Sequence, residues 1–268
     1  MSDPRERELL RLLLPAGCSC PLGKILEHAQ ISSADLAGTV ASLERGGFRF
    51  SQEGDSISLV AEPETLVSEG ILARLETRRI GRDVVVLKET SSTNDRVRQA
   101  GVAGAAEGLV IFAESQTAGR GTYGRKWVST PGAGLWFSIL LRSTLTVEQL
   151  PLLVQTAALA VAEAVEEWIP EHVEIKLPND LYLGDGKLAG FLLETSSSWD
   201  FQVLGIGINI REAPKIPAYP SSAMEQFSTE PIPRAELAAR ILSRFEYWCL
   251  DNEVEERVKA LAVRHRRA

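Results

Sequence analysis

The sequence predicts an α+β protein in which a small unit of helices and a hairpin precedes a larger domain of mixed strands and helices. Three segments with helical spacing, followed by two alternating strands, occupy the first sixty or so residues. After residue 65, short apolar runs that end in turn residues alternate with long amphipathic helices. A chain of 268 residues is long enough for about one or two domains and for a core that needs no disulfides.

The first part of the chain has the element order of a winged helix-turn-helix unit. Ser32 or Ser33 is placed to cap the third helix, and Gly46 and Gly47 end it. Helical spacing is found over 8–14, 22–29 and 33–43, and strands over 48–50 and 56–59 flank a turn at 53–55. Pro63 interrupts the periodicity, so we expect a linker at 61–64, a first domain over 1–64 and a second domain over 65–268.

The second part of the chain alternates strands with helices. Strands are expected at 84–87, 109–113, 135–141, 173–175, 188–193 and 203–210. A helix is expected to begin near Ser92, and apolar residues recur on one face of a long helix over 150–168. A last amphipathic helix starts near Pro233, where proline suits the first turn.

Composition and charge exclude several classes of protein. Cys18, Cys20 and Cys249 are too few for a disulfide framework, which favours a reducing compartment. A formal net charge of -7 argues against a general binder of nucleic acid or of anionic membranes. No apolar segment reaches the roughly 20 residues of a membrane span, and we therefore expect a cytoplasmic protein.

A glycine-rich basic loop is the most informative segment. Its three glycines loosely match a dinucleotide-binding pattern, but a strand follows them where that pattern requires a helix. Open backbone amides and unpaired positive charge suit a phosphate, although a solvated basic turn would look the same in isolation. The residues concerned are Gly119, Arg120, Gly121, Gly124, Arg125 and Lys126.

Further polar residues lie at the ends of the expected strands. Asn179 and Asp180 follow Lys176 in a turn restricted by Pro178, and their oxygens are of the kind that hold magnesium or a ribose. Lys187 opens the next strand, although a lysine at a strand end is more often just a solvated charge. Gly205 lies within a strand, where glycine often marks the close approach of a ligand or of another backbone.

These segments, in this order, resemble the biotin protein ligase family over about residues 84–210. The motifs that carry the resemblance are the loop from Gly119 to Trp127, the Lys-x-Pro-Asn-Asp turn at 176–180, Lys-Leu-Ala-Gly at 187–190 and Gly-Ile-Gly-Ile-Asn at 205–209. The resemblance implies a mixed sheet flanked by helices. It also implies a two-step reaction in which biotin and ATP, with Mg²⁺, form biotinyl-5′-adenylate and a lysine of a biotin carboxyl carrier protein then takes the biotinyl group.

The resemblance assigns roles to individual residues. Lys176 is expected to be the principal catalytic residue, with Arg120 beside it, both offsetting negative charge on the phosphate. The expected biotin-binding residues are Ser92, Thr93, Asn94, Gln116, Gly119, Arg120, Gly121, Lys176 and Gly205. The expected ATP-binding residues are Arg125, Trp127, Asn179, Asp180, Lys187 and Asn209. No metal site made of protein ligands alone is expected, since His28, His172 and His265 form no metal constellation.

Some features depart from the family pattern and leave alternatives open. Thr122 stands where many members have a second arginine that helps retain the adenylate, so we expect weaker retention or a different way of holding it. Little room remains after Asn209 for the C-terminal β-barrel of many relatives, and we expect it to be absent. A biotin-responsive transcription regulator and a lipoate ligase are the alternatives, and a homodimer stays open.

DNA binding by the first domain is doubtful on charge. Residues 1–64 carry six Lys or Arg and ten Asp or Glu, a net charge of -4. The candidate recognition helix over 33–43 contains Asp35 and no basic residue. Because phosphate neutralisation supplies much of the affinity for DNA, we expect a repurposed or purely structural domain.

Overall fold

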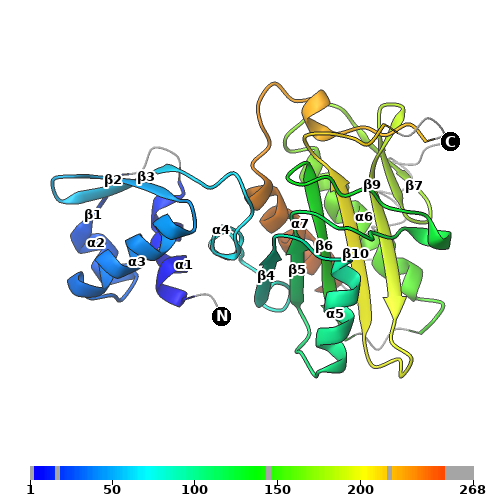
Figure 1. Cartoon of the computed structure of the whole chain (residues 1–268), viewed down its shortest axis with the longest axis horizontal. Coiled ribbons are helices and arrows are strands. Elements are labelled where there is room, and N and C mark those ends of the chain that lie inside the picture. The colour runs from blue at the N-terminus through cyan, green and yellow to red at the C-terminus, as the bar shows by residue number, and fades with distance from the viewer. Residues whose placement is uncertain (1–2, 16–18, 143–145, 216–218, 251–268) are drawn as a thin grey trace. The chain divides into compact units, whose positions relative to one another are not determined.

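The computed structural model describes residues 3–15, 19–142, 146–215 and 219–250, and the chain divides into two compact units (Figure 1). Unit 1 comprises Met1–Leu75 and unit 2 comprises Glu76–Ala268. The described residues do not include Cys18, His265 or the rest of the segment 251–268. The expectation that a C-terminal β-barrel is absent concerns this last segment.

A seven-stranded mixed sheet forms the centre of unit 2, as the resemblance implied. Its strands lie in the order β4-β5-β6-β10-β9-β8-β7, with β4 and β5 parallel and the other neighbouring pairs antiparallel. The bounds are β4 Asp83–Leu87, β5 Leu109–Ala113, β6 Gly134–Leu141, β7 Val173–Lys176, β8 Asp180–Leu183, β9 Gly186–Thr195 and β10 Gln202–Asn209. The inner strand β6 is buried along its whole length, which explains its nearly continuous apolar sequence.

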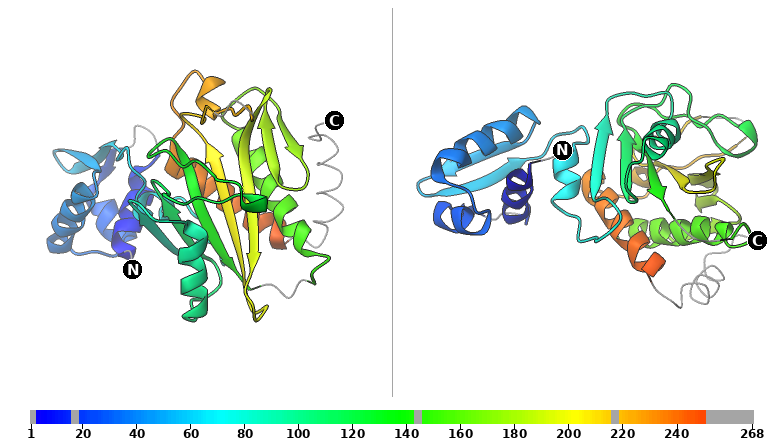
Figure 2. Two further views of the ribbon diagram at one scale, coloured as in Figure 1. Left: turned by 45° about the vertical axis from the view of Figure 1, so that its right-hand side comes forward. Right: turned by 90° about the horizontal axis from the view of Figure 1, so that it is seen from below.

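Helices cover both faces of this sheet (Figure 2). α5 (Thr93–Val102) lies on one face, against β5, β6 and β10. α6 (Leu150–Val165) and α7 (Arg234–Leu250) pack on each other and lie on the opposite face. Two short 3₁₀ turns, η1 (Thr122–Gly124) and η2 (Met224–Gln226), lie in the connections.

All six strands expected in unit 2 are present, and one further strand was missed. The missed strand, β8, begins immediately after the turn at Pro178. Its four residues are too few to show a recognisable alternation of apolar and polar side chains. The long helix expected over 150–168 ends at Val165, where the chain turns and the Trp168 N–H donates to the Val165 carbonyl.

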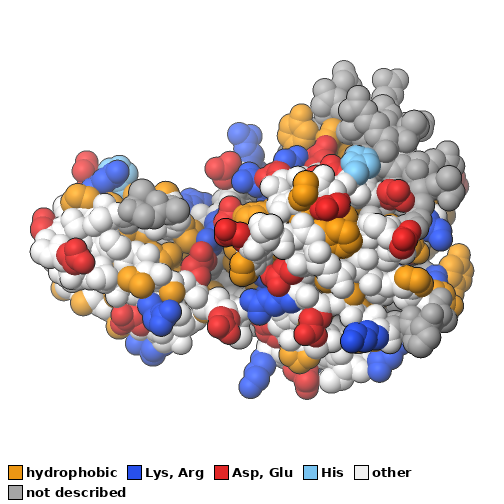
Figure 3. Space-filling view, turned by 90° about the horizontal axis from the view of Figure 1, so that it is seen from above, with side chains coloured by type: hydrophobic (Ala, Val, Ile, Leu, Met, Phe, Trp, Pro, Cys, Tyr) orange, Lys and Arg blue, Asp and Glu red, His pale blue; other side chains and the backbone are white. Residues whose placement is uncertain are grey.

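Charged side chains of both signs are interspersed on the surface. On the face drawn in Figure 3, Lys and Arg lie among Asp and Glu and are not gathered by sign. Within the described residues, no helix combines the length and the apolar character that crossing a bilayer requires.

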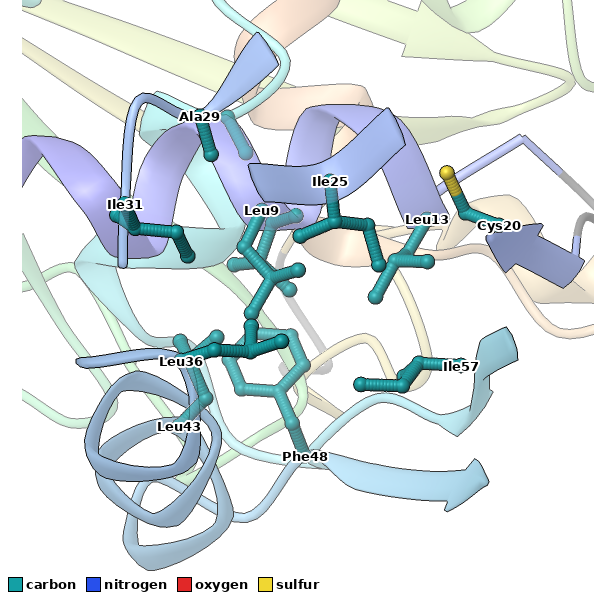
Figure 4. Packing of buried hydrophobic residues seen from close by; sticks show 12 residues of the cluster. Leu9, Leu13, Cys20, Ile25, Ala29, Ile31, Leu36, Leu43, Phe48 and Ile57 are labelled. Atoms are coloured by element: carbon teal, nitrogen blue, oxygen red, sulfur yellow. The ribbon is translucent and has the colours of Figure 1, made fainter. Parts of the chain in front are cut away.

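Unit 1 contains the three helices and the hairpin that the sequence predicts, together with one additional strand and one additional short helix. Its elements are α1 Pro4–Leu13, β1 Ser19–Pro21, α2 Leu22–His28, α3 Ser33–Arg45, β2 Arg49–Glu53, β3 Ser56–Ala61 and α4 Ser68–Leu72. Ser32 caps α3 by accepting from the Asp35 N–H. The sheet order is β1-β3-β2, and Leu9, Leu43 and Phe48 pack together beneath it (Figure 4). β1 is only three residues long and contains Pro21, so it carries no strand pattern.

The segment after Pro63 packs into unit 1, so this unit extends beyond the linker that we expected. Ala73 is buried in the core cluster of unit 1, and α4 contacts α1. The Arg11 guanidinium donates to the carbonyls of Ala73 and Leu75 at 3.2 and 3.0 Å. These contacts hold residues 65–75 against the first helix.

The helix α7 is fixed to unit 2 by two buried charged side chains. The Arg234 guanidinium donates to both oxygens of Glu114, at 3.0 and 3.1 Å, next to the end of β5. The Glu246 carboxylate is 6% exposed and accepts from the backbone N–H groups of Arg78, Arg79 and Ile80 at 2.6, 2.7 and 2.6 Å. One carboxylate therefore satisfies three consecutive donors of a segment that has no helix or strand to pair them.

Removing this carboxylate is expected to destabilise unit 2. Glu246→Ala should lower the free energy of unfolding by about 3 kcal/mol, because buried N–H groups lose charge-assisted hydrogen bonds. All five tryptophans lie in unit 2, so urea unfolding followed by tryptophan fluorescence reports on this unit alone. Glu230→Ala, at an exposed position before α7, is the control and should change the stability by less than about 0.5 kcal/mol. Equal stabilities of the two variants would contradict the anchoring role of Glu246.

Candidate functional site

A pocket of about 340 Å³ opens on unit 2 above strands β9 and β10. Its walls come from the start of α5, the loop 120–128, the β8 strand and residues 214 and 219–221. One end is lined by neutral polar groups and the other by basic groups beside a tryptophan.

The neutral end is a connected hydrogen-bond network. The Gln116 side-chain oxygen accepts from the Thr93 N–H at 2.8 Å, and its amide nitrogen donates to Ser129 at 2.9 Å. The Ser138 hydroxyl lies 2.7 Å from Thr93 Oγ1 and 2.6 Å from Asn94 Oδ1. Such a network fixes the direction of each donor and acceptor, which suits a ligand with a neutral group that both donates and accepts.

Gly205 makes room for this network. A Cβ at Gly205 would lie 2.2 Å from Asn94 Oδ1, so any side chain there would displace Asn94. Asn94 is held from its other side as well, because its amide nitrogen donates to Glu194 Oε2 at 2.7 Å. Gly205 does mark a close approach, but the approaching group is the Asn94 side chain in place of the expected ligand or backbone.

Arg120 lies between the two ends of the pocket. Its two terminal nitrogens donate to the Asp95 carboxylate at 2.9 and 2.6 Å, and Glu194 Oε1 lies 3.6 Å from Nη2. The hydrogen bond from Arg120 lowers the pKa of Asp95, and the hydrogen bond to Asp95 raises the pKa of Arg120. Both groups therefore stay ionised at neutral pH.

The basic end is built around Lys187 and Trp127. The Lys187 ammonium lies 2.6 Å from Asp180 Oδ1 and 5.4 Å from the centre of the Trp127 ring system. Trp127 lies against Gly190 and Gly207, where an added Cβ would come within 2.9 and 2.5 Å of the indole. Glycines at these two positions leave a flat surface for the ring.

Two buried polar atoms at this end have no hydrogen-bond partner within the described part of the chain. They are the Trp127 indole nitrogen and Asn209 Oδ1. The Asn209 amide nitrogen is already engaged with the carbonyls of Lys187 and Ser222, at 3.3 and 3.2 Å. A buried donor and a buried acceptor left open beside a cation are what a polar ligand would satisfy.

The glycine-rich loop is joined to the turn that precedes β8. The Asn179 amide nitrogen donates to the Phe191 carbonyl at 3.2 Å and lies 3.4 Å from Thr122 Oγ1. Arg125 also donates to Thr122 Oγ1, at 3.1 Å. The neighbouring Tyr123 has a φ of 57° and a side chain that is 92% exposed.

Most of the residues expected in the site line this one pocket. They are Ser92, Thr93, Asn94, Gln116, Arg120, Gly121, Arg125, Trp127, Asn179, Asp180, Lys187, Gly205 and Asn209. Gly119 is not among the lining residues. It lies behind them, where a Cβ would come within 2.6 Å of the Trp127 carbonyl oxygen.

Lys176, to which the sequence analysis gives the main catalytic role, does not line the pocket. It ends β7, the outermost strand of the sheet, and its exposed ammonium lies 5.3 Å from the centre of the Tyr182 ring. Lys187 lies two strands further in, on β9, and reaches the pocket. The sequence could not show how the two lysines are placed across the sheet, and the catalytic role expected of Lys176 stays a prediction.

Asp95, Ser138 and Glu194 are among the contributors to the site that were not expected. Ser138 gave a signal, because it is a lone hydroxyl in an otherwise apolar strand and is fully buried. Asp95 and Glu194 gave none, since acidic residues at the start of a helix and at the end of a strand are ordinary.

The oxygen ligands that the pocket offers are too few to hold a cation without additional ligands from a substrate. The described residues contain no group of three or more His, Cys, Asp and Glu side chains that could hold a metal. Asn179 and Asp180 supply an amide and a carboxylate oxygen at the basic end. This donor set fits Mg²⁺, which commonly takes one or two carboxylates from the protein and its other ligands from phosphates and water.

Comparisons with known proteins agree with this geometry. The model of the biotin/lipoate A/B protein ligase family matches residues 86–210. The chain is 31% identical over 257 residues to the bifunctional ligase/repressor BirA of Bacillus subtilis, covering 92% of this chain and 78% of that protein. It is 34% identical over 170 residues to the biotin–[acetyl-CoA-carboxylase] ligase of Mycobacterium tuberculosis, covering 62% and 63%.

Solved structures give the same answer for unit 2. A biotin protein ligase from Leishmania major in complex with biotin matches with a TM-score of 0.62 and 28% identity, covering 69% of this chain and 82% of that one. A biotin protein ligase from Aquifex aeolicus in complex with biotin and ATP matches with a TM-score of 0.55 and 32% identity, covering 68% and 72%. With its fold, its pocket and these relatives in agreement, the chain belongs to the biotin protein ligase family.

Proposed function

We propose that this chain is an ATP-dependent biotin ligase that forms biotinyl-5′-adenylate and transfers the biotinyl group to a lysine of a biotin carboxyl carrier protein. The observation that carries the proposal is one pocket with a neutral polar network at one end, a lysine beside an indole at the other, and an arginine between them. Relatives named as biotin ligases, some solved with biotin and ATP, support the same assignment.

The neutral end suits the ureido ring of biotin. That ring has two N–H donors and one carbonyl acceptor and carries no charge. Thr93, Asn94 and Gln116 offer hydroxyl and amide groups that are held in place by their own hydrogen bonds. Because these groups are fixed before the ligand arrives, little conformational entropy is lost on binding.

The basic end suits the nucleotide. The unpartnered Trp127 indole nitrogen and Asn209 oxygen are available to the polar edges of ATP, and the flat indole offers a surface to stack on. Asn179 and Asp180 would hold Mg²⁺ together with the phosphates. Mg²⁺ bound there would neutralise charge on the phosphates.

The first chemical step brings two anions together, and the cations of the pocket offset the repulsion. The biotin carboxylate oxygen bonds to the α-phosphorus of ATP as the bond to the pyrophosphate leaving group breaks. Two unit charges about 4 Å apart repel by about 4 kcal/mol at an effective dielectric constant of about 20. Lys187 and Arg120 both line the pocket, so we assign them this role, with Lys187 in place of Lys176.

In the second step the carrier lysine amine attacks the acyl carbon of the adenylate and AMP leaves. The negative charge that remains on the AMP phosphate is the same charge that Lys187 and Arg120 stabilise in the first step. The pocket needs no cysteine, histidine or serine nucleophile for this chemistry, since catalysis here consists of positioning and electrostatics.

The two lysines give a matched test of this assignment. Lys187→Met should lower the rate of biotin-dependent exchange between pyrophosphate and ATP by about 100-fold, because a preorganised charge at the phosphate is lost. Lys176→Met should change it by less than about threefold, as expected for an exposed charge. Pyrophosphate exchange needs no carrier protein, so the result does not depend on which carrier protein the enzyme modifies. Equal loss in both variants, or loss in Lys176→Met alone, would overturn the assignment.

Running the same exchange assay with lipoate tests the substrate. Biotin should support exchange and lipoate should not, because lipoate has a disulfide-containing ring in place of the hydrogen-bonding ureido ring that the neutral network suits. Exchange that depends on lipoate but not on biotin would replace the proposed activity with lipoate ligation.

The position of Thr122 gives a second prediction, on retention of the adenylate. Thr122→Arg should slow the release of biotinyl-5′-adenylate by about tenfold, the equivalent of one added charge-assisted hydrogen bond to the phosphate. Thr122→Ser keeps the hydroxyl that contacts Arg125 and Asn179, and should release the adenylate at the wild-type rate. Equal release rates for Thr122→Arg and wild type would refute the idea that this loop retains the adenylate weakly.

For unit 1 we propose a structural or repurposed role in place of operator binding. α3 carries Asp35, which accepts a hydrogen bond from the Ser32 hydroxyl at 2.7 Å, and its basic residue Arg45 comes only at its end. A helix with so little positive charge neutralises few phosphates. In a gel shift at low salt, DNA from upstream of biotin genes and a scrambled duplex should bind equally weakly. Preferential binding of the upstream DNA would contradict this role.

A further inference from the structure

An ion pair between α5 and the glycine-rich loop stands apart from the roles assigned so far. Asp95 lies in the first turn of α5, directly after the pocket residues Thr93 and Asn94. Its carboxylate receives both terminal nitrogens of Arg120, at 2.9 and 2.6 Å. The pair therefore connects the helix that forms the neutral end of the pocket with the loop that carries its central cation.

The geometry of the pair leaves Arg120 able to bind a second anion. A guanidinium has five N–H donors, and a carboxylate that meets its two terminal nitrogens takes two of them. Asp95 thus fixes the plane of the guanidinium while three N–H groups stay outside the pair. One of these lies on the nitrogen that Glu194 Oε1 approaches at 3.6 Å.

Glu194 extends the same connection across the sheet. Its Oε2 accepts from Asn94 Nδ2 at 2.7 Å and lies 3.2 Å from the Arg98 guanidinium. Asn94, Glu194, Arg120 and Asp95 form a closed chain of contacts that begins and ends at the start of α5. A displacement of Arg120 is therefore opposed from two directions.

Elsewhere the loop is attached by the packing of Trp127 against β9 and β10 and by weaker hydrogen bonds. Gly121 and Trp127 donate to the Arg125 and Gly119 carbonyls, which are contacts within the loop. Thr122 meets Asn179 across a separation of 3.4 Å, longer than either bond between Arg120 and Asp95. The Asp95 carboxylate is thus the closer of these two attachments between the loop and another element.

We propose that Asp95 is a positioning residue that holds Arg120 across the pocket and keeps the loop 119–127 closed over bound biotinyl-5′-adenylate. This inference rests on the proposed function. It predicts that a change at Asp95 affects the binding of the adenylate and the binding of biotin to different extents. Loss of Asp95 should weaken the hold on the adenylate, whose phosphate needs Arg120, and should affect biotin less, because the neutral network for its ring is unchanged.

A different role for Asp95 would change adenylate binding in the opposite direction. If Asp95 only neutralised Arg120 and competed with anionic ligands, then removing its charge would free the guanidinium and tighten adenylate binding. The direction of the change in adenylate affinity therefore distinguishes a residue that positions Arg120 from one that competes with anionic ligands for it.

The test measures the dissociation of synthetic labelled biotinyl-5′-adenylate from the full-length chain during a chase with unlabelled adenylate. Asp95→Asn should release the adenylate about tenfold faster than wild type, as expected for the loss of a partly exposed charged contact at the site. Its affinity for biotin, measured by calorimetry, should change by less than about threefold. Because the adenylate is supplied ready-made, the result does not depend on catalysis.

Two further variants separate positioning from a general loss of structure. Glu107→Gln breaks another ion pair between arginine and a carboxylate, the 2.6 Å contact with Arg79 outside the pocket, and should release the adenylate at the wild-type rate. In an Arg120→Gln background, Asp95→Asn should add no further acceleration, because a residue that acts through Arg120 has nothing left to position.

The outcomes distinguish this inference from the function on which it rests. Wild-type protein that does not bind the adenylate would overturn the proposed function. Wild-type protein that binds it, with release unchanged or slower in Asp95→Asn, would overturn the positioning role alone. An acceleration that persists in full in the Arg120→Gln background would also overturn it.

Discussion

The site depends on the close approach of side chains to a part of the sheet that has none of its own. Gly190 and Gly207 are directly opposite each other on β9 and β10, and together they form the flat surface against which the Trp127 indole lies. Two residues earlier on β10, Gly205 leaves the space that Asn94 fills. Alternate residues of a strand share one face, so these β10 glycines act on the same side of the sheet. Both ends of the pocket are thus fixed by one short stretch of strand.

The layout of strands places one of the two motif lysines beside the pocket and the other at the edge of the sheet. Lys176 and Lys187 are eleven positions apart in sequence, and both lie at strand ends beside a turn. The sheet places one on its outermost strand and the other two strands further in. Only the inner lysine meets the tryptophan and the carboxylate of Asp180. A motif gives residue types and spacing, whereas the distance of a side chain from the pocket depends on this lateral position.

Much of the fold could be predicted from the sequence because unit 2 alternates clearly between apolar runs and turns. The strand at 109–113 was located to the residue, and the long helix after Leu150 to within its last turn. The prediction failed where a pattern had too few residues to repeat, as in β8. In the site, glycines and amides in motifs were found. The link from Asp95 to Arg120 was not, because the two residues are 25 positions apart and Asp95 belongs to no distinctive pattern.

The two cations of the pocket have a common arrangement, because each is paired with a carboxylate. Lys187 meets Asp180, and Arg120 meets Asp95. An ammonium has three donors and a guanidinium five, so each cation can keep its carboxylate and still bind an anionic ligand. The carboxylates reduce the net positive charge of the pocket, but they also fix the direction of the N–H donors of Lys187 and Arg120. Because catalysis gains most from charges that need not reorganise during the reaction, a paired and oriented cation serves this chemistry better than a free one.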